Sequence, residues 1–98
     1  MSSNDQSARH APRFSLGRIV ATPSALRAIP NEEILRALDL HASGHWGELD
    51  PMDRKANEVA LLTDARLLSS YRSTSGNVFW IITEADRSST CVLLPEDY

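Results

Sequence analysis

The residue types best suited to chemistry lie in residues 84–88, where the sequence EADRS joins two apolar runs near the C-terminus. Two carboxylates and a guanidinium could act as an acid, a base and an anion clamp. Neither a histidine nor a metal-binding motif accompanies Glu84, Asp86 and Arg87. Charged residues in so short a connector more often order a turn through local hydrogen bonds. We therefore predict a partner-binding loop or a turn at these residues, and no catalytic set.

Trp46 is a second candidate binding residue, because it lies in a predicted connector beside Gly47. Tryptophan is enriched at the energetic centres of protein interfaces. A loop tryptophan can instead close one end of a hydrophobic core. The sequence leaves both roles open for Trp46.

Two histidines, His41 and His45, have the four-residue spacing that can hold zinc on one helix face. Gly44 lies between them and is expected to end that helix. We therefore expect no metal site: His41 should be a cation near the helix C-terminus, and His45 a surface residue. Glycine-rich phosphate loops and the GxSxG and CxxC motifs are absent from the sequence, so we expect no cofactor.

The charge and cysteine content favour a protein partner in the cytoplasm. Thirteen acidic and ten basic residues give a formal charge of -3, which matches nucleic acid poorly. Cys91 is the only cysteine, so an intrachain disulfide is excluded and we expect a small buried side chain. No apolar run approaches the roughly 20 residues of a membrane span, and no secretory signal is visible.

The first half of the chain predicts a tail, a strand and two helices. Residues 1–13 are polar and lack apolar periodicity, which predicts a disordered tail. Residues 14–21 alternate in the manner of a strand. Thr22 and Pro23 are typical of the start of a helix, here predicted over residues 24–29. Asn31 is predicted to cap a second helix that ends at residue 43.

The second half predicts a third helix and three strands. Asp50 and Pro51 mark the start of a helix that runs to about residue 63. Its expected buried stripe consists of Met52, Ala56, Val59, Ala60 and Thr63. Strands are predicted over residues 66–73, 78–83 and 89–94, with a hairpin turn at residues 74–77. The strand over residues 78–83 is apolar on both faces, so we expect it to be covered on both sides.

These elements predict a single α+β domain over residues 14–98. Their order is β-ααα-βββ, and we expect an antiparallel sheet with the helices packed on one face.

Three longer stretches resemble a small family of uncharacterised bacterial proteins carried by plasmids and integrative elements. The stretches are FSLGRIVATP, HWGELDPMDRKANEVAL and FWIITEADRSSTCVLLPEDY. Members of that family are often automatically labelled "type I restriction endonuclease subunit M". A DNA methyltransferase needs a cofactor-binding α/β domain and an Asn-Pro-Pro-Tyr-type motif, and this sequence has neither. The resemblance therefore implies a mobile-element protein and supplies no catalytic residues.

We expect a non-enzymatic protein-interaction module of a mobile element, such as one that counters a host restriction or CRISPR effector. One alternative is a toxin of the RelE/ParE-like fold, or a small ribonuclease or hydrolase, that uses Glu84, Asp86 and Arg87; this is a fold-level analogy. A further alternative is a DNA-binding regulator. It would act as a dimer through four arginines: Arg9, Arg13, Arg18 and Arg27.

Overall fold

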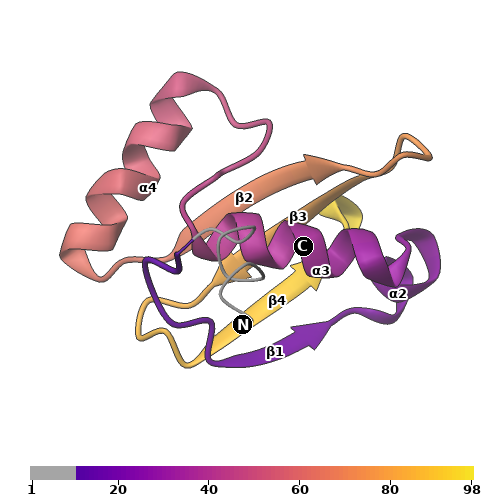
Figure 1. Ribbon diagram of the computed structural model, residues 1–98, viewed down its shortest axis with the longest axis horizontal. Helices are drawn as coiled ribbons and strands as arrows, with labels where there is room; N and C mark the ends of the chain where they lie inside the picture. The colour runs from indigo at the N-terminus through magenta and orange to yellow at the C-terminus, as the bar shows by residue number, and fades with distance from the viewer. Residues whose placement is uncertain (1–10) are drawn as a thin grey trace, which may run out of the picture.

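The computed structural model describes residues 11–98, and it confirms both the α+β class and the predicted order of elements (Figure 1). The elements are β1 (Arg18–Ala21), α2 (Pro23–Ala28), α3 (Asn31–Ala42), α4 (Pro51–Thr63), β2 (Leu67–Arg72), β3 (Val78–Thr83), β4 (Ser89–Leu93) and a short 3-10 helix, η1 (Pro95–Asp97). The predicted tail lies mostly in residues 1–10, outside the described residues. Arg13, which we assigned to that tail, is held by a backbone hydrogen bond to Ala42.

The four strands form one mixed sheet in the order β1-β4-β3-β2. β2 and β4 both run antiparallel to β3, but β1 runs parallel to β4. The expectation of a wholly antiparallel sheet is therefore wrong at β1, because apolar alternation carries no information about strand direction. β1 is also shorter than predicted. Gly17 has a φ of +63°, which ends the extended backbone before Arg18.

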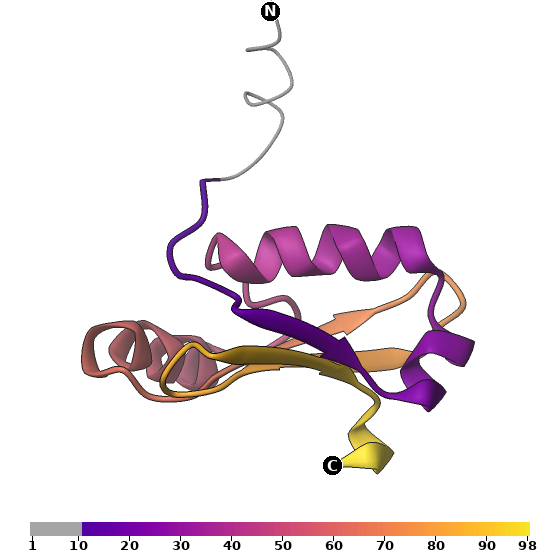
Figure 2. The same ribbon diagram turned by 90° about the horizontal axis from the view of Figure 1, so that it is seen from below.

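We expected the three helices to share one face of the sheet, but they do not. Figure 2 shows α3 lying across one face, while α4 and α2 lie beyond opposite ends of the sheet. The main core lies between α3 and the sheet. It is built from Ala25, Ile29, Ile34, Ala37, Leu38, Tyr71, Phe79, Ile81, Val92 and Leu94. Within residues 11–98, the C-terminal segment covers part of the other face, where the Tyr98 ring contacts that of Trp80 (centroids 5.9 Å apart).

Two of the three predicted helix caps are confirmed. The Thr22 hydroxyl accepts a hydrogen bond from the backbone N–H of Ala25 at 3.2 Å. The Asp50 carboxylate accepts one from the N–H of Asp53 at 2.8 Å. The predicted cap of α3 is wrong: Asn31 is already helical, and Pro30 precedes it without a side-chain cap. The residue before the helix must be extended, and proline fixes a compatible φ there.

The outer edge of β2 is closed by side-chain and loop contacts. The Asn57 side chain from α4 donates to the carbonyl of Leu68 at 2.6 Å and accepts from its N–H at 3.1 Å. Further along, Ser70 exchanges backbone hydrogen bonds with Trp46 and Glu48 at 3.2 and 2.7 Å. No backbone group is therefore left for another strand at Leu68 or Ser70.

None of the helices within residues 11–98 has the length and apolarity needed to cross a bilayer.

Candidate functional site

Arg87 joins the β3–β4 connector to the end of α4. Its guanidinium donates to the carbonyls of Ala60 and Ala65 at 3.1 and 2.7 Å, and to those of Glu84 and Ala85 at 3.1 and 3.2 Å. The Ala60 carbonyl also accepts hydrogen bonds from the backbone N–H groups of Asp64 and Ala65, so Arg87 adds a side-chain donor to the C-terminal end of α4. These contacts give the Arg87 side chain a structural role that the sequence did not reveal.

The two carboxylates of the connector have separate partners. Asp86 is exposed and accepts a hydrogen bond from the backbone N–H of Ser88 at 3.0 Å. Hydrogen bonding from Ser88 lowers the pKa of the Asp86 carboxyl. Glu84 lies 3.5 Å from Arg66 in a half-exposed ion pair. The turn interpretation thus accounts for Asp86, while Arg87 and Glu84 make contacts to distant parts of the chain.

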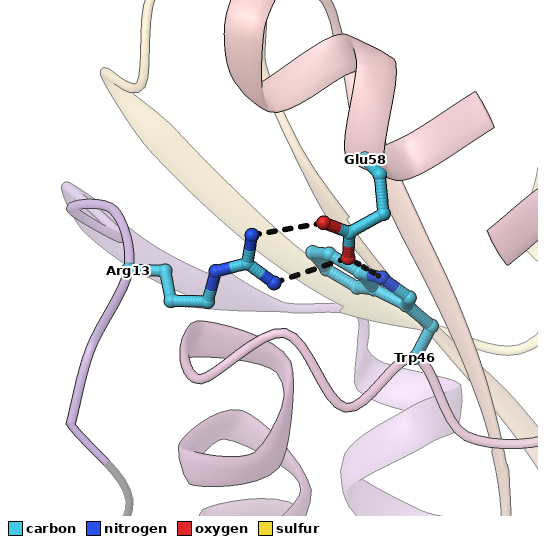
Figure 3. Close-up of polar contacts among 3 residues, drawn as sticks. All are labelled: Arg13, Trp46 and Glu58. Carbon is cyan, nitrogen blue, oxygen red and sulfur yellow. Dashed lines mark hydrogen bonds and ion pairs between the residues drawn. The ribbon is translucent and has the colours of Figure 1, made fainter. Parts of the chain in front are cut away.

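Trp46 is only 2 % exposed and therefore closes one end of the core. Its indole N–H donates to the Glu58 carboxylate at 3.0 Å, and Arg13 binds the same carboxylate through two hydrogen bonds of 3.0 and 2.8 Å (Figure 3). Arg13 and then Trp46 lower the pKa of Glu58 through these bonds. Because Trp46 is buried, it offers no surface to a partner.

His41 is fully buried, and the expectation of a helix-terminal cation is wrong. Burial, with a smaller contribution from the positive charge of Arg87, lowers the His41 pKa to about 4. Phe14 and Trp46 pack against the imidazole edge to face, with ring centroids 5.3 and 5.7 Å away. The ring is therefore neutral at neutral pH.

A chain of buried hydrogen bonds assigns the His41 tautomer. Thr90 donates to the Leu16 carbonyl at 2.7 Å, so the Thr83 hydroxyl, 2.7 Å away, must donate to Thr90. Thr83 must then accept from His41 Nε2–H at 2.9 Å. Nδ1 of the neutral ring is left as an acceptor for Ser69 at 2.5 Å. The sequence signal for this network was the polar residues at inward positions of three strands.

No group of three His, Cys, Asp or Glu side chains within residues 11–98 is arranged to hold a metal ion. Cys91 is half-buried in β4, and burial raises the pKa of its thiol. A thiol with a raised pKa is mostly protonated at neutral pH, which suits a packing role better than a nucleophilic one.

Helix α4 exposes four of the five residues that we predicted to be buried: Met52, Ala56, Val59 and Thr63. Met52 is 80 % and Leu62 87 % exposed, and Val59 is exposed as well. We call this surface the α4 stripe; it consists of Met52, Ala56, Val59, Leu62 and Thr63. Ala60 is buried as predicted, but the other buried residue of α4 is the polar Asn57. The helix is turned so that a polar side chain faces the sheet and an apolar stripe faces outward.

A second exposed apolar surface lies at the free edge of β1. We call it the β1 groove; its apolar lining includes Ile19, Val20, Leu26, Ile34, Leu35 and Leu38. The groove has a volume of about 300 Å³ and runs between β1 and the helices α2 and α3. Ile19 is 50 % and Leu35 66 % exposed. Large apolar side chains thus gather at the one sheet edge that carries no covering segment among residues 11–98.

Comparisons with protein-family models, with curated proteins and with solved structures find no match to this chain.

Proposed function

We propose that this protein is a non-enzymatic protein-interaction module that presents the α4 stripe to a partner protein. The carrying observation is the rotation of α4, which exposes Met52, Val59 and Leu62 while burying Asn57. Leaving several large apolar side chains in water on one helix face forgoes the stabilisation that burial would give, about 25 cal/mol per Å². A partner that covers the stripe would recover that free energy.

Local geometry fixes the rotation of α4. The two hydrogen bonds between Asn57 and the backbone of Leu68 orient the helix, because turning it to bury the stripe would break both. The stripe is therefore a permanent feature of the fold that is present before any partner arrives. Preformed surfaces lose less conformational entropy on binding.

The stripe favours a partner with an apolar groove that accepts an amphipathic helix. Lys55 is exposed and lies one helical turn from Met52 and from Val59, so it borders the stripe. An acidic rim on the partner's groove would complement Lys55. In this proposal the module acts in the cytoplasm. The resemblance to mobile-element proteins favours a host restriction or CRISPR effector as the partner.

The contacts of the connector support this proposal over the hydrolase alternative. The Arg87 guanidinium is surrounded by backbone carbonyls, and the Asp86 carboxylate is engaged with Ser88. For the DNA-binding alternative, Arg13 is neutralised by Glu58. Arg18 and Arg27 remain exposed, and Arg9 lies outside the described residues.

A pull-down from host lysate with a tagged chain tests the proposal. The wild-type chain is expected to recover a stoichiometric protein, and Leu62→Glu is expected to lose it. Leu62 is so exposed that the substitution should change stability by less than about 0.5 kcal/mol. Tyr98→Glu is the matched control, since Tyr98 is also well exposed but lies outside α4. Equal recovery by all three chains, or recovery by none, would contradict the proposed function.

A further inference from the structure

The backbone of β1 leaves hydrogen-bonding groups free along its outer edge. The N–H groups of Arg18 and Thr22 point inward and donate to Ser88 and Val92, both at 3.0 Å. In a strand the peptide groups of alternate residues point to opposite sides, so those of Ile19 and Ala21 point outward. Within residues 11–98 no segment pairs with them. This edge can accept another strand.

We propose that the occupant of this edge is a second copy of the same chain, paired antiparallel through β1 about a two-fold axis at Val20. Ile19 of each copy then lies opposite Ala21 of the other, and the two residues exchange both backbone hydrogen bonds. The two sheets become one continuous sheet. This inference goes beyond the proposed function, because it concerns β1 and leaves the α4 stripe uncovered.

The local backbone selects this register over its neighbours. Sliding the strands so that Ile19 lies opposite itself places Ala21 opposite Gly17, whose φ of +63° is not extended. Sliding them the other way places Ile19 opposite Pro23, which has no N–H to donate. Only the two-fold at Val20 uses both outward peptide groups of each copy.

Charge complementarity favours a second copy over an unrelated strand. In this register Arg18 lies opposite Thr22 of the second copy, on the face of the sheet away from α3. The Thr22 hydroxyl donates to the Asp97 carboxylate at 2.7 Å, which places that carboxylate beside Thr22. Arg18 is exposed and makes no ion pair with any residue in 11–98. The two-fold therefore brings an unpaired cation of each copy toward a carboxylate of the other.

The apolar side chains at the edge are also self-complementary. Val20 of each copy would meet its equivalent across the two-fold, where facing residues approach most closely. On the α3 side, Ile19, Leu26 and Leu35 of both copies would line one shared groove. Side chains that are exposed in the single chain would cover one another.

Disulfide trapping tests the pairing and its register together. Val20→Cys in a Cys91→Ala background should give a disulfide-linked species of twice the 10.9 kDa chain mass under mild oxidation. The background removes Cys91, which neighbours Val20 in the sheet. Ile19→Cys in the same background is the control, because its equivalents do not face each other in this register. Cross-linking of Ile19→Cys with none at Val20→Cys would overturn the proposed two-fold.

Charge substitution at the same position provides the second test. Native mass spectrometry of the purified wild-type chain should show a dimer whose fraction rises with concentration. Val20→Lys and Val20→Glu should each lose the dimer, because like charges would meet across the two-fold. Mixing the two variants should restore it as a heterodimer.

A wild-type chain that stays monomeric at every concentration, with no disulfide trapping, overturns the inference. The proposed function would be unaffected, since its test reads capture through Leu62. If Val20→Lys instead loses a lysate partner while the purified chain is monomeric, the edge binds a strand of another protein and the second copy is excluded.

Discussion

The guanidinium of Arg87 lies 3.1 Å from the carbonyl oxygen of Ala60, across 27 residues of sequence. This contact joins the β3–β4 connector to the last turn of α4. Arg87 itself adopts a left-handed backbone conformation, with a φ of 63°. The side-chain hydrogen bonds of Arg87 thus stabilise the fold, while its left-handed backbone conformation destabilises it.

Comparing Arg87→Ala with Arg87→Gly should separate these two effects. Both variants lose the hydrogen bonds to α4, and Arg87→Ala should lower the free energy of unfolding by about 2–3 kcal/mol. Arg87→Gly should be less destabilised, by about 1 kcal/mol, because glycine adopts positive φ without strain. Urea denaturation measures both values. Equal stability of Arg87→Ala and wild type would contradict the structural role.

Stability should fall between pH 6.5 and 4.5 because of His41. The folded-state pKa of about 4 lies below the usual 6.5, so only the unfolded chain takes up the proton in this range. The stabilisation is complete above pH 6.5 and is lost as the pH falls toward 4, with about 2–3 kcal/mol lost by pH 4.5. Urea denaturation across this range should show the slope in wild type and in His45→Gln. His41→Gln should be less stable at neutral pH and should lack the fall between pH 6.5 and about 5.5, which lies above the range where the carboxyls of Glu58 and Asp86 take up protons in the unfolded chain.

Gly47→Ala should be far more destabilising than Gly76→Ala. Both glycines have positive φ, +75° and +92°, so each substitution carries a similar backbone strain of about 1 kcal/mol. A Cβ at Gly47 would lie 1.9 Å from the Ser70 carbonyl oxygen, whereas one at Gly76 would meet nothing within 4 Å. The added clash should cost Gly47→Ala about 2 kcal/mol more. Thermal unfolding measures both variants, and similar melting temperatures would contradict the close packing of Gly47 on β2.

Asn57→Ala should both destabilise the fold and open the β2 edge. The substitution leaves the N–H and the carbonyl of Leu68 without partners, which should cost about 2–4 kcal/mol. The exposed edge should also let chains assemble beyond a dimer, which light scattering would detect. Asn77→Ala is the control, because Asn77 lies in the exposed turn before β3. A stable Asn57→Ala chain with unchanged mass would exclude this role.

The sequence predicted a feature correctly where residues close together in the chain determine it. The caps at Thr22 and Asp50 depend on neighbours within three residues, and both were readable. The orientation of α4 could not be read from the sequence. Its apolar spacing indicated one buried face, whereas Asn57 binds a strand eleven residues away. The parallel direction of β1 depends on contacts with β4 about 70 residues later.

In the candidate site, too, features set by nearby residues were predictable and features set by tertiary contacts were not. The turn at Asp86 is local and was predicted as one of two possibilities. Arg87 binds α4, and His41 binds β2 and β3, so their roles depend on tertiary contacts that no spacing of residues reveals. Trp46 was ambiguous because an indole suits both a core and an interface.

The two edges of the sheet differ, and this difference limits how many chains can join by strand pairing. Among residues 11–98, Asn57 and the Trp46–Glu48 segment close β2 at Leu68 and Ser70, which leaves β1 as the open edge; the proposed two-fold pairing would use that edge in both molecules. Strand addition through β1 would therefore stop at a pair of chains and would not propagate into a fibre. The protein could thus expose the unpaired edge of β1 without polymerising through it.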